Sequence, residues 1–131
     1  MASLNGITWS GKPKFQIRNP SYNSTNLYID LAVGHVWRID CNNISGAIGT
    51  LTVQNVPSTA NIVSSFLLGV IQGPSPASNY LNWSAMSNVK WNASTGAPTV
   101  TTTDNAVDYF SFTTWDNGTT WYGTTVGQDI K

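Results

Sequence analysis

Apolar and polar residues alternate along several stretches of the chain, which is the pattern of β-strands that bury one face. Residues 27–33 place Leu, Ile, Leu and Val at every second position, and residues 35–40 continue the alternation after Gly34. These two stretches are either adjacent strands or one strand bent at Gly34. Residues 50–56 and 107–114 alternate in the same way. Gly, Pro, Asn, Ser and Thr interrupt every helix-like apolar repeat, so the sequence predicts strands and no regular helix.

Residues 62–72 form the most continuous apolar segment of the chain. Its length fits a strand covered on both faces or a short buried helix, and Gly69 together with the β-branched Val63 and Val70 favours the strand. Residues 73–76, Gly-Pro-Ser-Pro, end any ladder or helix. We interpret them as a loop inside one domain, because either half of the chain alone is close to the smallest size that holds a core.

A hairpin is predicted at residues 116–118, Asp-Asn-Gly, between two alternating stretches. Asn and Gly adopt positive φ at little cost, so the chain can reverse there with the twist of paired strands. Residues 119–126 then return as the partner of residues 107–114. With Asn and Gly as the two loop residues, Trp121 lies opposite Thr114 on the neighbouring strand.

Short strands separated by turn signals are typical of proteins that bury a core between two sheets. The sequence therefore predicts a single all-β domain, an antiparallel β-sandwich or jelly-roll-like fold, over residues 27–131. Residues 1–26 form an N-terminal arm in this interpretation. Four of its side chains are candidates for contact with a neighbouring subunit: Lys12, Lys14, Phe15 and Arg18. The alternative for this arm is a plain edge strand, which lysine protects from unwanted pairing.

Charge is scarce and balanced, since 9% of the 131 residues are charged, with six Lys and Arg against six acidic residues. The basic residues are scattered, whereas a nucleic-acid-binding surface clusters them. No charged leader followed by an apolar run opens the sequence, and the longest apolar stretch is far shorter than a bilayer span. We therefore expect no nucleic-acid binding, no membrane insertion and a protein that is soluble where it is made.

Few side chains suit catalysis: one histidine, His35, one cysteine, Cys41, and aspartates without any glutamate. No nucleophile signature accompanies His35, and Cys41 is interpreted as a small buried apolar residue. Asp108 and Asp116 are the candidate carboxylate pair of a glycosidase, yet Asp116 belongs to the turn and Asp108 shares a strand face with phenylalanines. No partners stand at metal-ligand spacing. The sequence predicts no enzymatic activity, no metal and no cofactor.

Six tryptophans are more than packing of a chain this size usually requires. Trp37 and Trp121 lie on strands with apolar neighbours and are expected in the core. The candidates for contact with a partner or ligand flank the hairpin tip or lie in less regular segments: Trp83, Trp91, Trp115, Asn117 and Tyr122. The first two are expected to line a groove. At the hairpin tip, packing and partner contact are equally expected.

The second half of the chain carries motifs in a distinctive order: Trp83, Asn88-Val89-Lys90-Trp91, Gly96-Ala97-Pro98-Thr99, Asp104-Asn105-Ala106-Val107-Asp108 and the stretch from Phe112 to Gly123. With these motifs, residues 82–131 resemble a C-terminal β domain that recurs in fibre and appendage proteins of tailed bacteriophages, especially phages of cyanobacteria. The resemblance implies a structural role in the virion, usually as a trimer of β-sandwich units, and it brings no catalytic residues with it.

Two functions follow from this resemblance as expectations. The first is a non-enzymatic structural protein of a tailed-phage virion, exposed on the particle surface as a capsid decoration or cement protein or as a small appendage subunit, because no fibre shaft precedes the first strand. Such a protein is assembled in the host cytoplasm, forms a homotrimer and contacts other capsid or tail proteins. The alternative is the receptor-binding tip of a tail fibre, which recognises a host-surface glycan through aromatic, Asn and Thr side chains.

Overall fold

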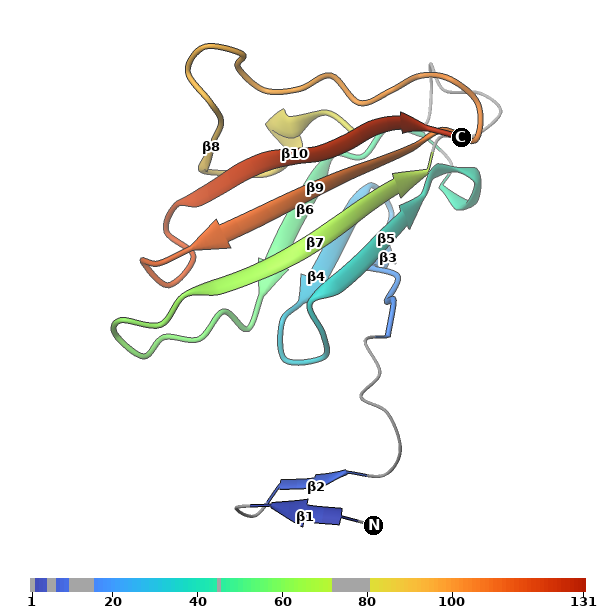
Figure 1. Cartoon of the computed structure of the whole chain (residues 1–131). Coiled ribbons are helices and arrows are strands. Elements are labelled where there is room, and N and C mark those ends of the chain that lie inside the picture. The colour runs from blue at the N-terminus through green and yellow to red at the C-terminus, as the bar shows by residue number, and fades with distance from the viewer. Residues whose placement is uncertain (1, 5–6, 10–15, 45, 72–80) are drawn as a thin grey trace.

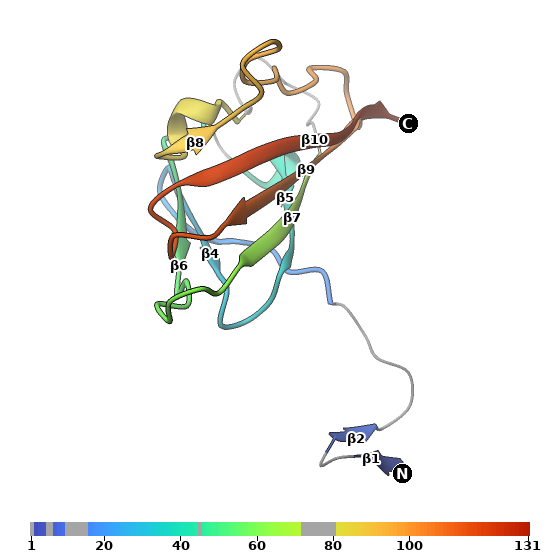
Figure 2. The ribbon, with the colours of Figure 1, turned by 60° about the vertical axis from the view of Figure 1, so that its left-hand side comes forward.

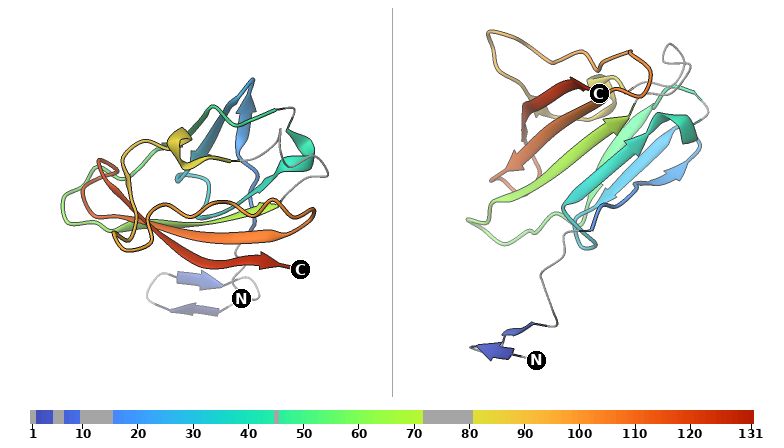
Figure 3. Two further views of the ribbon diagram at one scale, coloured as in Figure 1. Left: turned by 90° about the horizontal axis from the view of Figure 1, so that it is seen from above. Right: turned by 45° about the vertical axis from the view of Figure 1, so that its right-hand side comes forward.

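The computed structural model describes residues 2–4, 7–9, 16–44, 46–71 and 81–131 of the chain. Its main body consists of two β-sheets (Figure 1), which lie as two layers when viewed from above (Figure 3, left). The helical elements among the described residues are two single-turn 3-10 helices, η1 (Cys41–Asn43) and η2 (Trp83–Ala85). The all-β sandwich that the sequence predicts is confirmed.

The larger sheet has five strands in the order β5 (Val36–Asp40), β7 (Ser64–Ile71), β9 (Val107–Thr114), β10 (Trp121–Ile130) and β8 (Val89–Lys90). The smaller sheet has three, in the order β3 (Ser21–Asn23), β4 (Asn26–Asp30) and β6 (Thr50–Gln54). A separate antiparallel pair joins β1 (Ala2–Leu4) to β2 (Ile7–Trp9). Every second position of β9 is buried, because one face of its sheet meets the other layer.

Strands β4 to β7 alternate between the two sheets along the chain, with β4 and β6 in the smaller sheet and β5 and β7 in the larger one. β6 runs in the same direction as its neighbour β4, and β7 runs in the same direction as its neighbour β5, so both pairs are parallel. β8 and β10 are also parallel. The sandwich is therefore mixed, whereas the sequence predicted an antiparallel one. Alternating polarity reports the buried face of a strand and not the direction of its neighbour, which explains the difference.

The two stretches on either side of Gly34 are neither adjacent strands nor one bent strand, because β4 and β5 lie in different sheets. A tight turn after Asp30 separates them. The N–H groups of Val33 and Gly34 donate to the Asp30 carbonyl at 3.1 and 3.3 Å. The Asp30 carboxylate accepts from Ala32 N at 2.9 Å. Val33 consequently lies exposed in the turn instead of on a buried face.

The predicted hairpin joins β9 to β10. Its turn at residues 116–119 closes through a hydrogen bond of 3.2 Å between the first carbonyl and the last N–H. The two central residues, Asn117 and Gly118, have φ values of 58° and 83°, as a type I′ turn requires. Tyr122 pairs with Thr113, which is the register predicted from a two-residue turn.

The core lies between the inner faces of the two sheets. Its buried side chains come from both layers: Leu27, Ile29 and Leu51 from the smaller sheet, and Trp37, Ile39, Phe66, Leu68, Val70, Phe110, Phe112 and Trp121 from the larger one. Phe66 and Phe112 stack with ring centroids 5.0 Å apart, and Trp121 meets Phe66 edge-on at 5.3 Å. Trp37 and Trp121 are therefore core residues, as the sequence predicted.

Part of the predicted N-terminal arm belongs to the sandwich. β3 pairs with β4, and Arg18 forms an isolated parallel bridge with Trp37 at the edge of β5. There the Arg18 N–H donates to Val36 O at 2.9 Å, and the Arg18 carbonyl accepts from Arg38 N at 2.8 Å. The sheets thus begin before residue 27. The other three arm candidates lie outside the described residues: Lys12, Lys14 and Phe15.

Candidate functional site

The structure gathers four of the predicted contact residues in two places. Trp83 and Trp91 meet in the segment between β7 and β9, with ring centroids 5.0 Å apart. Trp115 and Tyr122 meet beside the β9–β10 turn, with centroids 4.6 Å apart, and we call them the aromatic pair. Asn117 lies in the turn itself. The chain therefore presents two separate candidate surfaces.

Trp83 is fixed by the single turn of η2. The Asn82 side chain accepts from Ser84 N at 3.0 Å, and the Asn82 carbonyl accepts from Ala85 N at 2.9 Å. The Trp83 ring points inward, meets Phe110 edge-on at a centroid distance of 4.7 Å and is only 6% exposed. Its indole Nε1 is buried and has no hydrogen-bond partner among the described residues. Trp83 is thus mainly a core residue, and its indole N–H is an unsatisfied hydrogen-bond donor among the described residues.

Trp91 is positioned by β8, which pairs with the start of β10. Its ring lies across Gly123 of β10, where a Cβ would come within 2.6 to 2.9 Å of three ring carbons. The edges of Phe110 and Phe112 support the ring at centroid distances of 6.3 and 5.7 Å. Only glycine at position 123 leaves room for this approach. Trp91 is half-buried and remains open to the surface on part of its ring.

The loop after Trp91 is held by its own hydrogen bonds. The Asn92 side chain accepts from Ser94 N at 2.8 Å, and its carbonyl accepts from Thr95 N and Gly96 N at 3.2 and 2.7 Å. Gly96 has a φ of 68°, which suits glycine. Residues 91–106 then pass over β10 (Figure 2), where Gln128 Nε2 donates to Thr99 O at 2.7 Å. The loop is therefore held by hydrogen bonds within the chain.

Two cavities meet at Trp91 and Pro98, and together we call them the Trp91 cleft. The first has a volume of about 750 Å³, with an apolar wall that includes Trp83, Met86 and Val100. The second has a volume of about 500 Å³ and is lined by polar residues around the Trp91 ring: Asn92, Thr95, Thr124, Thr125 and Gln128. Every residue lining either cavity is uncharged. The cleft is therefore an aromatic and polar site without fixed charge.

The second cavity was missed at the sequence level, although Trp83 and Trp91 were expected to line a groove. Thr124, Thr125 and Gln128 of its polar lining belong to β10 and lie more than thirty positions beyond Trp91 in the chain. One local signal was available. Gly123 interrupts an otherwise regular strand, and a glycine there indicates the close approach of another group.

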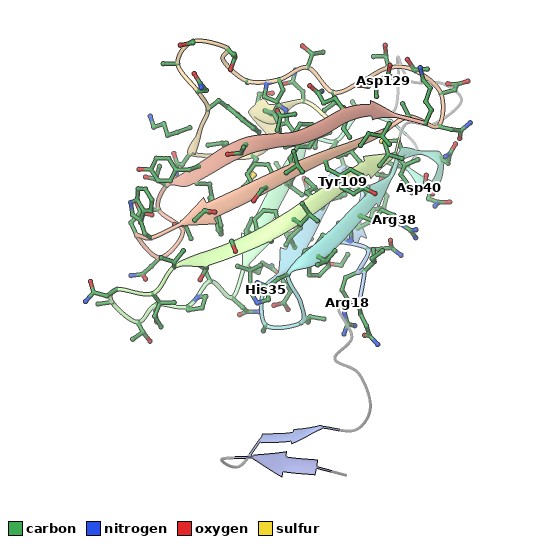
Figure 4. All side chains as sticks on the ribbon, in the orientation of Figure 1. Arg18, His35, Arg38, Asp40, Tyr109 and Asp129 are labelled. Atoms are coloured by element: carbon green, nitrogen blue, oxygen red, sulfur yellow. The ribbon has the colours of Figure 1, made fainter. Side chains whose placement is uncertain are left out.

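The aromatic pair lies on the outer face of the larger sheet. Trp115 is 60% exposed and Tyr122 is 38% exposed. The outward positions of the three central strands are Ser65, Leu67, Gly69 and Ile71 on β7, Val107, Tyr109, Ser111 and Thr113 on β9, and Tyr122, Thr124, Gly127 and Ile130 on β10. None of these residues is charged. The exposed charges of this sheet lie toward its margins: Arg38 and Asp40 on β5, as Figure 4 shows, Lys90 on β8, and Asp129 at the end of β10, which pairs with Lys131.

Asn117 holds the hairpin turn against the loop that follows β6. With its nitrogen turned toward them, the side-chain amide donates to the carbonyls of Thr59 and Pro57 at 3.1 and 3.2 Å. Gly118 lies against Val56, whose nearest methyl would be 3.1 Å from a Cβ at position 118. Asn117 is exposed, and its amide serves a contact within the chain.

The candidate glycosidase residues do not form a pair. Asp108 is 1% exposed, and its carboxylate accepts from Thr101 N at 2.7 Å and from Asp129 N at 2.9 Å. Asp108 lies on β9 and Asp116 in the turn after it, and the six strand positions from Asp108 to Thr114 alone span roughly 20 Å. Glycosidase carboxylates stand roughly 5 to 10 Å apart. Both aspartates organise the backbone around them.

Asp116 closes the hairpin loop. Its Oδ1 accepts from Thr120 N at 2.8 Å and from Thr114 Oγ1 at 2.8 Å. Thr114 Oγ1 in turn accepts from Gly118 N at 3.0 Å. The backbone hydrogen bond from Thr120 is the largest cause that lowers the pKa of Asp116, because it favours the ionised carboxylate.

Neither His35 nor Cys41 forms part of a reactive cluster in the described structure. His35 is exposed, and its Nδ1 lies 2.8 Å from the carbonyl of Ser65. Burial raises the pKa of the Cys41 thiol to about 11, with the nearby charge of Asp40 as the second cause. Cys41 is therefore a protonated, buried side chain at neutral pH.

Within the described ranges, no group of three or more His, Cys, Asp or Glu side chains could hold a metal ion. The same residues contain no helix that is long and apolar enough to cross a membrane. Comparison of the chain with protein-family models, with curated proteins and with solved structures finds no match of any of the three kinds.

Proposed function

We propose that this chain is a non-enzymatic structural subunit of a tailed-phage virion, displayed on the particle as a capsid decoration or cement protein or as a small appendage subunit. The observation that carries the proposal is the aromatic pair on an outer sheet face whose outward ladder positions on β7, β9 and β10 bear no charge. The resemblance of residues 82–131 to fibre and appendage domains supports the virion as its location.

The composition of this face suits contact with other protein. Docking removes water from the groups that it covers, which costs much for ions and little for aromatic, aliphatic and hydroxyl groups that find partners. Trp and Tyr are enriched among the residues that contribute most to interfaces. Trp115 and Tyr122 would be the anchor of the contact, with Arg38, Asp40 and Lys90 at its rim.

A homotrimer is part of the proposal, and it can be tested with purified protein. The double variant Trp115→Ser/Tyr122→Ser removes the anchor, whereas Tyr22→Ser removes an exposed aromatic residue from the smaller sheet. In sedimentation velocity runs we expect trimers for the wild type and for Tyr22→Ser, and monomers for the double variant. A wild-type protein that stays monomeric at high concentration, and that antibody labelling fails to find on intact particles, would overturn the proposal.

A receptor-binding tip is the second candidate function, and the Trp91 cleft is the observation that favours it. A site with an aromatic wall, polar rim and no charge is suited to a small hydroxylated ligand. The position of the antibody label separates the candidates, because a receptor-binding tip is found only at the distal ends of tail fibres. Label on the head or on the collar supports the structural role.

A further inference from the structure

We propose that the Trp91 cleft binds a neutral oligosaccharide, with the Trp91 ring as the platform for one sugar unit. This inference deepens the second candidate function, on which it rests, by naming the ligand class of the same cleft. Both cavity volumes, about 750 and 500 Å³, fall within the range of roughly 300 to 1,000 Å³ typical of ligand sites. The two cavities share Trp91 and Pro98 in their lining, so adjoining sugar units can occupy them with one unit against the exposed part of the ring.

The lining of the cleft selects the class of ligand. Because no charged side chain lines it, nothing in its walls offsets the desolvation of a phosphate, sulfate or carboxylate. A lipid tail requires a continuous apolar wall, whereas the second cavity is lined mostly by threonine and amide groups around one aromatic ring. Sugar rings combine C–H faces, which pack on the π face of an indole, with hydroxyl groups at their edges.

Hydrogen-bonding groups stand unused around the ring. The hydroxyls of Thr95 and Thr125 have no partner among the described residues. Among the described residues, Asn92 bonds only through its Oδ1 and Gln128 only through its Nε2. The Nδ2 of Asn92 and the Oε1 of Gln128 therefore remain available. Hydroxyl and amide groups donate and accept, which matches the donor and acceptor character of sugar hydroxyls.

The platform is held in place before any ligand binds. Phe110 and Phe112 support the Trp91 ring edge-on, and Gly123 lies directly beneath it. The loop of residues 92–96 is closed by hydrogen bonds to Asn92. Little conformational freedom therefore remains to be lost on binding, which favours affinity for a small ligand.

The test measures binding to purified protein by calorimetry. The probes are tetrasaccharides of glucose, mannose and galactose, each with a sulfated counterpart. The variant Thr95→Val/Thr125→Val removes two hydroxyls of the cleft and preserves side-chain shape. Its matched control, Thr103→Val/Thr119→Val, makes the same change at two exposed threonines outside the cleft. A third protein, Trp115→Ala, disrupts the aromatic pair and leaves the cleft intact.

We expect at least one neutral probe to bind, its sulfated counterpart to bind more weakly, and the cleft variant to raise its Kd by about tenfold through the two lost hydrogen bonds. The control and Trp115→Ala should keep wild-type affinity. The proposal fails when no neutral probe binds, when sulfated probes bind better, or when the cleft variant matches its control. Binding lost in Trp115→Ala would overturn it by moving the sugar site to the aromatic pair. The trimer and particle experiments are independent of all these outcomes.

Discussion

At the scale of single residues, Asp108 shows how one buried carboxylate ties three segments together. β10 is irregular opposite Asp108, with breaks in its pairing between Thr125 and Gly127 and between Gly127 and Ile130. An irregular strand leaves backbone N–H groups without ladder partners. The Asp108 carboxylate accepts a hydrogen bond from one such group in β10, the N–H of Asp129. It also accepts one from the N–H of Thr101, in the loop that covers β10. A residue that could be mistaken for a catalytic acid therefore satisfies backbone donors.

The variant Asp108→Ala should lower the free energy of unfolding by about 3 kcal/mol, because it leaves buried N–H donors without an acceptor. Urea unfolding followed by tryptophan fluorescence measures this change. Asp104→Ala, at an exposed aspartate four positions earlier, is the control and should change the stability by less than about 0.5 kcal/mol. Equal effects of the two substitutions would show that the Asp108 hydrogen bonds contribute nothing specific.

At the scale of elements, the β9–β10 hairpin is specified almost entirely by local residues. Asn117 and Gly118 supply the two positive φ angles of the turn. The Asp116 carboxylate accepts a hydrogen bond from Thr120 N, and the ladder between the two strands starts beyond it, at Tyr122 and Thr113. The turn sequence and the side-chain cap therefore act together, and the cap depends on the charge of Asp116.

The cap gives the protein an acid-sensitive element. The pKa of Asp116 is lower in the folded chain than in the unfolded chain, so its stabilising effect is complete above about pH 3.9 and disappears as the pH falls through the folded value. Asp116→Asn removes this dependence. Melting curves between about pH 2 and 7 should show a smaller loss of Tm in acid for Asp116→Asn than for the wild type. Parallel curves for the two proteins would contradict the prediction.

At the scale of the whole molecule, the two candidate surfaces occupy different places on the same sandwich. The Trp91 cleft lies where loop residues 91–106 cross β10, and the aromatic pair lies beside the hairpin turn on the outer sheet face. Trp91 and Trp115 are therefore separable by mutation. Under the two proposals above, the aromatic pair would contact neighbouring subunits and the Trp91 cleft would bind a ligand.

An uncharged interface predicts how assembly responds to salt. If subunits meet through the central strands of the outer face, raising the ionic strength from about 0.05 to 0.5 M should leave the dissociation constant of the trimer almost unchanged, because screening acts on charges. Sedimentation equilibrium at the two salt concentrations measures this. Assembly that weakens strongly with salt would instead place the contact on Arg38, Asp40 or Lys90.

How far the sequence predicted this molecule depended on the range of the interactions. Residues 107–122 were predicted with their register because the turn signal and the alternation are local. The stretches 27–33 and 35–40 were recognised as strands but not placed, since sheet membership is decided by pairing with Thr50 and Leu67, far along the chain. The cleft was anticipated only through its tryptophans. The part of its polar lining that β10 supplies could not be predicted, because nothing local in the sequence shows that β10 passes beneath Trp91.

The alternation of β4 to β7 between the layers has a consequence for how the chain folds. Asn26 meets Thr50 and Val36 meets Leu67, so each of these pairs closes a large loop of backbone before it gains any contact. Closing such loops costs conformational entropy and slows folding, whereas the C-terminal hairpin closes over a few residues. We therefore expect the hairpin to nucleate folding. Strands β4 to β7 would then pack against the hairpin, and both sheets would be completed in the same late step.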